Sequence, residues 1–154
     1  MTQLEKQLQE CRKCGGVNLD LSGLDISDLG CVWEFPNLQV LYVSSTQVND
    51  LSPLKDLVNL KQLYVSETQV SNLSHLRGLT DLQVLSVSRT QVSDLTPLKD
   101  LANLQELYVS RTQVSDLSPL KDLVNLQELY VYQTQIIDFS VLDHLAENGL
   151  EIYK

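Results

Sequence analysis

The sequence is poor in aromatic residues, in basic residues and in long apolar runs. Only 6% of its 154 residues are aromatic, whereas 43% are hydrophobic and 20% are charged, which is a globular composition. Leucine and valine dominate the apolar residues, so we expect many similar packing positions in place of one irregular core. Acidic side chains outnumber basic ones by 20 to 11, giving a net charge of -9, and no basic run or RNP-like motif is present. This balance argues against a nucleic-acid partner and against a phosphate-rich membrane surface.

No segment approaches the roughly 20 consecutive apolar residues that a membrane span requires. The N-terminal sequence MTQLEKQLQECRK is polar and lacks the apolar region of a secretory signal. An odd number of cysteines argues against a disulfide framework and for reduced thiols. We therefore expect a cytoplasmic location.

A period of 22 residues dominates the rest of the sequence. Five consecutive repeats between residues 38 and 147 place the same apolar or hydroxyl side chains at the same offsets. One column contains Leu38, Leu60, Leu82, Leu104 and Leu126, and another contains Thr46, Thr68, Thr90, Thr112 and Thr134. Residues 16–37 form a degenerate repeat in which Gly16 replaces the first leucine, as is common at the end of a solenoid.

The pattern L-x-x-L-x-V-x-x-T-x-V-x-x-L-x-x-L-x-x-L resembles the 22-residue class of leucine-rich repeats, which occurs in bacterial internalins and nuclear protein-phosphatase regulators. The resemblance covers nearly the whole chain. It implies an α/β fold, namely a right-handed solenoid with a concave parallel β-sheet and short 3₁₀ or α turns on its convex side. Threonine stands where the family usually has asparagine, and its hydroxyl can replace only part of the asparagine's hydrogen bonding.

The organisation that follows is a single domain over residues 1–154. Thr2 and Glu5 have the spacing of a capping box, and Leu4, Leu8 and Cys11 then lie on one stripe of a helix. We predict an N-terminal helical cap at 1–15, the degenerate repeat at 16–37, five repeats at 38–147 and a C-terminal edge strand at 148–154.

Three of the convex segments carry a helix-start signal. Ser-Pro or Thr-Pro pairs predict a hydroxyl N-cap followed by proline at the first helical position, as at Ser52, Thr96 and Ser118. An acidic column precedes these starts, consisting of Asp28, Asp50, Asp94, Asp116 and Asp138. Single carboxylates at this place favour an interaction with the helix dipole over a cation site.

Motifs for catalysis are missing. Cys11 and Cys14 have the spacing of half a zinc site, but the other ligands of a tetrahedral site have no candidates nearby. His75 and His144 lie three repeats apart on the convex side, too far to share a nucleophile. No phosphate loop, dinucleotide fingerprint or metalloprotease motif occurs. We expect no enzymatic activity, no cofactor and no metal.

The predicted concave face is the part of the surface with a distinctive composition. Residues between the inward leucine and valine of each repeat point out of the sheet, and these are Asp20, Tyr42, Tyr64, Ser86, Tyr108 and Tyr130. Tyr132 lies two positions beyond the last of them. The charged or polar positions nearby are Glu67, Arg89, Glu106, Arg111, Glu128 and Gln133. Variation between otherwise near-verbatim repeats concentrates here, and tyrosine and arginine are enriched at binding hot spots.

The leading hypothesis is a non-catalytic protein-interaction module, an adaptor or inhibitor, for a partner with a basic or mixed-charge surface. The candidate contact residues are Tyr42, Tyr64, Glu67, Ser86, Arg89, Glu106, Tyr108, Arg111, Glu128, Tyr130 and Tyr132. Two alternatives stay open, a carbohydrate-binding module that uses the tyrosine row and a consensus or engineered repeat scaffold. Tyrosine also suits a strand for purely structural reasons, through cross-strand packing.

Overall fold

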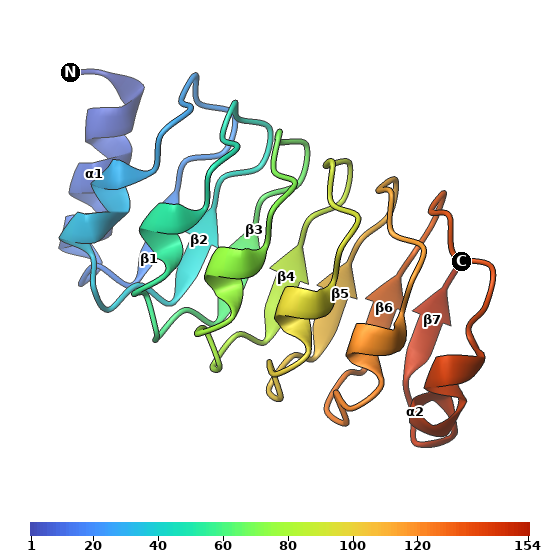
Figure 1. The fold of residues 1–154 in the computed structure, drawn as a ribbon. Coiled ribbons are helices and arrows are strands. Elements are labelled where there is room, and N and C mark those ends of the chain that lie inside the picture. Colours follow the sequence, from blue (N-terminus) through green and yellow to red (C-terminus); the bar gives the residue numbers. More distant parts are fainter.

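A computed structural model describes residues 1–154 as a right-handed solenoid built around one parallel sheet (Figure 1). The sheet has seven strands in the order of the sequence, β1 to β7, and all neighbours are parallel. The strands are β1 (Asn18–Asp20), β2 (Val40–Tyr42), β3 (Gln62–Tyr64), β4 (Val84–Ser86), β5 (Glu106–Tyr108), β6 (Glu128–Tyr130) and β7 (Glu151–Tyr153). The predicted leucine-rich-repeat fold is therefore confirmed.

The 22-residue period fixes the register of the sheet. Leu41, Leu63 and Leu85 are direct partners in adjacent strands, and all three are fully buried. Their neighbours on either side in each strand face the concave surface, because side chains alternate across a strand. The inward residues join a continuous core of 41 buried residues that runs the length of the molecule.

The threonine column closes the turn after each strand. The Thr90 hydroxyl is buried and donates a hydrogen bond of 2.6 Å to the carbonyl oxygen of Val87. The backbone N–H of Val92 approaches the same hydroxyl at 3.4 Å. Threonine thus satisfies the carbonyl well and the amide only weakly, as expected for a single hydroxyl at this position.

Short 3₁₀ turns return the chain along the convex side. They comprise Gly30–Glu34, Ser52–Leu54, Ser74–Leu76, Thr96–Leu98, Ser118–Leu120 and Ser140–Leu142. The predicted hydroxyl N-caps are wrong, since none of these turns has a side-chain hydrogen bond from its capping residue. Instead, the carboxylate of Asp50 accepts the backbone N–H of Ser52 at 2.8 Å, and Asp94 does the same for Thr96.

The residue three positions after the end of each strand from β2 to β6 adopts a left-handed backbone. Ser45, Glu67, Arg89, Arg111 and Gln133 have φ between 55° and 58°, and we call these five residues the turn row. In the degenerate repeat the same position holds Gly23, with φ 70°. Glycine adopts this conformation without steric cost, whereas the other side chains do not.

Two helices close the ends. Helix α1 (Gln3–Lys13) lies against β1 at the N-terminal end, and its predicted capping box between Thr2 and Glu5 is present (Figure 1). Its residues Leu8 and Cys11 are buried in the core. Helix α2 (Asp143–Glu147) leads into β7 at the other end. Neither helix combines the length and apolar character that crossing a bilayer needs.

Candidate concave binding face

Five tyrosines form a ladder along the concave face, and we call them the tyrosine ladder: Tyr42, Tyr64, Tyr108, Tyr130 and Tyr153. The first two rings stack with centroids 4.7 Å apart and planes 8° from parallel. The last three stack at 4.4 Å across each interval. Ser86 lies between Tyr64 and Tyr108 in the register of the sheet, so the ladder consists of two stacks with a gap.

Four of the five rings lie along their strands, with the hydroxyl bonded to the side chain two positions earlier, and these are Tyr64, Tyr108, Tyr130 and Tyr153. The Tyr108 hydroxyl donates to the carboxylate of Glu106 at 2.8 Å, and the Tyr130 hydroxyl donates to Glu128 at 2.7 Å. Burial raises the pKa of Tyr108, and the hydrogen bond to Glu106 raises the pKa further. The Tyr108 phenol therefore remains a protonated donor across the physiological pH range.

Three glutamates form an acidic row beside the second stack: Glu106, Glu128 and Glu151. They occupy successive parallel strands, whose spacing is about 4.8 Å. The ion pairs of the chain are Arg12–Glu34, Lys13–Glu10 and Arg89–Glu67, so no member of the acidic row faces a cation. Like charges at this spacing repel one another, and only the tyrosine hydroxyls offset that repulsion.

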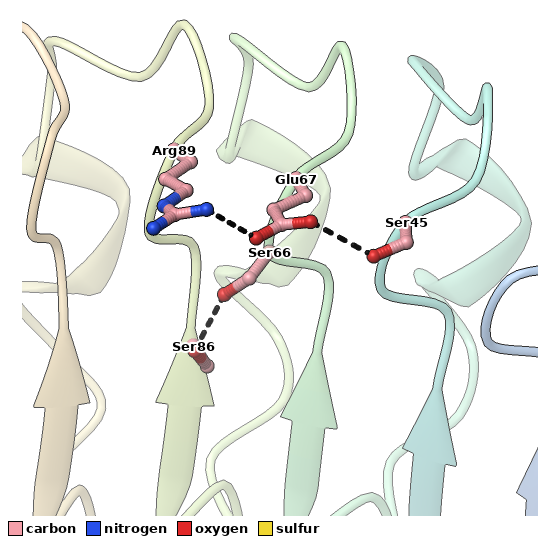
Figure 2. A network of polar contacts seen from close by, with 5 residues as sticks. All are labelled: Ser45, Ser66, Glu67, Ser86 and Arg89. Atoms are coloured by element: carbon pink, nitrogen blue, oxygen red, sulfur yellow. Dashed lines mark hydrogen bonds and ion pairs between the residues drawn. The ribbon is translucent and has the colours of Figure 1, made fainter.

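The turn row follows the opposite margin of the same face. Figure 2 shows Glu67 between two partners, with Arg89 donating at 2.7 Å and the Ser45 hydroxyl donating at 3.0 Å. The side chain of Arg111, one repeat further on, is exposed and makes no hydrogen bond or ion pair within the chain. One margin of the face thus carries carboxylates without an ion-pair partner, and the other carries the guanidinium of Arg111, which also has none.

The structure brings most of the predicted residues onto this face and separates one of them. Tyr132 lies beyond the end of β6, is 45% exposed and belongs to neither stack. The backbone N–H of Tyr132 donates to the Ser110 hydroxyl at 3.1 Å. The contact role of these residues stays a prediction.

Sequence reasoning missed Tyr153 and Glu151 as members of the ladder and the acidic row. The step from Tyr130 to Tyr153 is 23 residues, so the strict period did not reach them. A shorter signal was available. The triplet Glu-Leu-Tyr of β5 and β6 returns as Glu-Ile-Tyr in β7, which identifies the same pairing of carboxylate and phenol.

The three cysteines are free thiols, and no cluster of three or more histidine, cysteine or acidic side chains has the geometry of a metal site. Cys11 is buried, and this burial raises the pKa of its thiol. A raised thiol pKa disfavours the reactive thiolate. On the convex side, the imidazole of His144 lies 2.7 Å from the carbonyl oxygen of Lys121.

Comparison with known proteins supports one family. The model of leucine-rich repeats in two copies matches residues 58–100 and again 102–144. An internalin (inlF) of Listeria monocytogenes superposes with a TM-score of 0.79 at 29% identity, covering 84% of this chain and 38% of that one. Internalin C2 of the same organism gives 0.76 at 34% identity, covering 88% of this chain and 70% of that one. No curated protein matches the chain.

A more distant leucine-rich-repeat protein of Leptospira interrogans shares the fold, with a TM-score of 0.64 at 17% identity over 90% of this chain. The chain spans well under half of the inlF chain and about two thirds of internalin C2. The family model covers more than half of the residues, and the repeats it describes are those whose register builds the sheet. The chain belongs to the leucine-rich repeat family, with internalin-like repeats.

Proposed function

We propose that the chain is a non-catalytic protein-interaction module that binds its partner on the concave face. The observation that carries this proposal is the tyrosine ladder, in which five rings are held in two stacks on one open surface. Four of the five hydroxyls, those of Tyr64, Tyr108, Tyr130 and Tyr153, donate to neighbouring side chains, so these rings lose little further freedom when a partner covers them. Rigid tyrosines of this kind supply much of the energy of protein interfaces.

The charges at the two margins indicate the chemistry of the partner. The free carboxylates of the acidic row attract basic side chains, and Arg111 attracts an acidic one. A partner of mixed charge, with its basic groups toward β5 to β7, fits this arrangement. Such a protein would act as an adaptor or as an inhibitor of the partner it covers.

Carbohydrate recognition fits the ladder less well. Sugars bind aromatic side chains through the ring faces, but the stacked rings lie only 7° to 9° from parallel and cover one another's faces. They present mainly their edges to solvent. We therefore expect no binding to a glycan array.

The proposal is tested with peptides selected on the purified chain from a random dodecapeptide library displayed on phage. We expect the triple substitution Tyr64→Ala, Tyr108→Ala and Tyr130→Ala to weaken the selected peptides by at least roughly tenfold. The matched control is Lys55→Ala, Lys99→Ala and Lys121→Ala, which removes three exposed side chains from the convex side. Thermal melts verify that both variants fold. Equal binding to the tyrosine variant and the wild-type chain would contradict the proposal.

A further inference from the structure

The gap in the tyrosine ladder has the dimensions of one more planar group. Tyr64 and Tyr108 occupy strands that are two intervals apart, with Ser86 in the strand between them. Two strand intervals amount to about 9–10 Å. Stacked rings in this molecule are 4.4 to 4.7 Å apart, so a planar group midway between Tyr64 and Tyr108 would stack on both.

The side chain at the gap is turned away from it. Figure 2 shows the Ser86 hydroxyl directed at the Ser66 hydroxyl, 2.7 Å away at the C-terminal end of β3. The tyrosine rings lie in the opposite direction, toward the residues two positions earlier. The floor beneath the gap is therefore Val84, which is apolar and only 7% exposed.

The gap is also where ring faces inside the ladder remain uncovered. Within each stack the rings cover one another, but Tyr64 has a stacked neighbour only on the Tyr42 side. Tyr108 has one only on the Tyr130 side. One face of the Tyr64 ring and one face of the Tyr108 ring thus face each other across the position of Ser86.

Hydrogen-bond acceptors flank the same position. Gln62 and Glu106 are the register neighbours of Val84, and each accepts the hydroxyl of the tyrosine in its own strand. A carboxylate has about four lone-pair sites, so Glu106 retains acceptor capacity after binding Tyr108. No cation of the chain pairs with Glu106.

We propose that this gap binds the guanidinium group of an arginine on the protein partner. Guanidinium is planar, stacks on aromatic faces and carries its donors in the plane of the group. Between Tyr64 and Tyr108 it meets a ring on each side, its edge donates to the carboxylate of Glu106, and its aliphatic stem passes over Val84. Lysine lacks the planar shape, and phenylalanine lacks the charge that Glu106 complements. This assignment rests on the proposed function and names the side chain that the concave face recognises.

The experiment is an NMR titration of the aromatic resonances with acetyl-arginine methylamide, and with the lysine and phenylalanine analogues as comparisons. We expect arginine to shift the ring signals of Tyr64 and Tyr108 in a saturable way, at least several-fold more tightly than lysine or phenylalanine. Equal affinity for lysine, or preference for phenylalanine, would overturn the assignment to guanidinium.

Substitutions at Ser86 and Glu106 separate the gap from the rest of the face. Ser86→Tyr places the side chain of the other repeats in the gap, and we expect it to raise the melting temperature while weakening arginine at least tenfold. The control Lys99→Ala removes an exposed side chain from the convex side and should bind arginine as the wild type does. Glu106→Gln keeps the acceptor of the Tyr108 hydroxyl, as the Tyr64–Gln62 pair shows, and should weaken arginine several-fold. Arginine binding unchanged by Ser86→Tyr would overturn the proposal.

The same variants distinguish this inference from the proposed function. If peptide binding is weakened by the ladder substitutions but not by Ser86→Tyr, the concave face binds protein without using the gap, and the inference is wrong. If arginine occupies the gap but no selected peptide depends on the ladder, the gap stands and the proposed function fails.

Discussion

At the scale of single residues, the turn row works against the stability of the fold. Glu67, Arg89 and Arg111 hold a left-handed backbone that disfavours every side chain with a Cβ. The first repeat uses Gly23 at the same position, so the fold itself accepts glycine there. The later repeats carry charged or polar side chains at this cost, and they carry them at the margin of the concave face. Strain that persists at one exposed position of successive repeats indicates a use for those side chains.

Substituting glycine for Arg111 should stabilise the chain. The change relieves the left-handed strain, and the exposed side chain has no partner to lose. We expect the free energy of unfolding to rise by about 1 kcal/mol in urea titrations. Arg111→Ala is the matched control, because it removes the same side chain and keeps the Cβ, and it should leave stability close to the wild-type value. Equal stability of the two variants would show that the backbone at this position is unstrained.

At the scale of the elements, the aspartate that precedes all but one of the 3₁₀ turns replaces a helix cap. Hydrogen bonds from Ser52 lower the pKa of the Asp50 carboxyl, and those from Ser118 lower the pKa of Asp116. The third repeat has Asn72 at this position, and its side-chain oxygen accepts the backbone N–H of Ser74 at 2.9 Å. The amide therefore forms the same turn without a titrating group.

These carboxylates predict how stability depends on acid. A group whose pKa is lower in the folded chain binds fewer protons than the unfolded chain does, so its stabilising contribution is present above the unfolded value of 3.8. The contribution is lost as the pH falls through the lower, folded value. Replacing Asp50, Asp94, Asp116 and Asp138 by asparagine should flatten the fall in unfolding free energy below about pH 4, measured by urea titration at a series of pH values. If the unfolding free energy of the variant falls as steeply with acid as that of the wild type, other carboxyl groups cause the fall.

The sequence predicts the features that recur in every repeat. It does not predict which of two neighbouring side chains accepts a backbone N–H at a turn. The period places Leu41 and its equivalents inward because each occupies the same environment in every turn of the solenoid. Near each 3₁₀ turn, however, a carboxylate and a hydroxyl stand two residues apart, as at Asp50 and Ser52, and either can accept a backbone N–H. The pattern does not reveal which of them does so.

Two features of the candidate site could not be predicted from the 22-residue pattern. Nothing in the composition of Glu67 or Arg111 signals a left-handed backbone, since only Gly23 in that column has the expected residue type. The extra residue between β6 and β7 hid Tyr153, although the edge strand that contains it was predicted. The predicted tyrosine row itself lies on one face, and its gap at Ser86 follows directly from the column.

At the scale of the whole molecule, each repeat contacts mainly its two neighbours, and the ends depend on their caps. The strand pairs are formed only between consecutive strands, from β1–β2 to β6–β7. Stability in such an array is close to a sum over repeats and the interfaces between them. Length should therefore be adjustable at the least cost in whole periods.

Deleting residues 62–83 removes one period of 22 residues and joins two equivalent positions. We expect a shorter solenoid that unfolds cooperatively in urea, with an m-value lower by roughly a seventh because less surface is exposed on unfolding. Deleting residues 62–82 instead leaves one extra residue at the junction, which a loop must accommodate, as one does in the 23-residue step from Tyr130 to Tyr153. Circular dichroism should show native sheet in both variants, and urea titration should give the second variant the lower free energy of unfolding. A first variant less stable than the second would contradict adjustment by whole periods.

The division of the ladder into two unequal stacks also affects the near-ultraviolet circular dichroism of the molecule. Chromophores held face to face at 4.4 to 4.7 Å share their electronic excitations, so the two-ring and three-ring stacks behave as two coupled absorbers of different length. The twist of the sheet makes each of them chiral. The single indole, Trp33, is 72% exposed on the turn Gly30–Glu34 and takes no part in this coupling. The coupled near-ultraviolet dichroism of the stacked tyrosines thus reports on the concave face, and a group that enters the gap between the two stacks should change this signal.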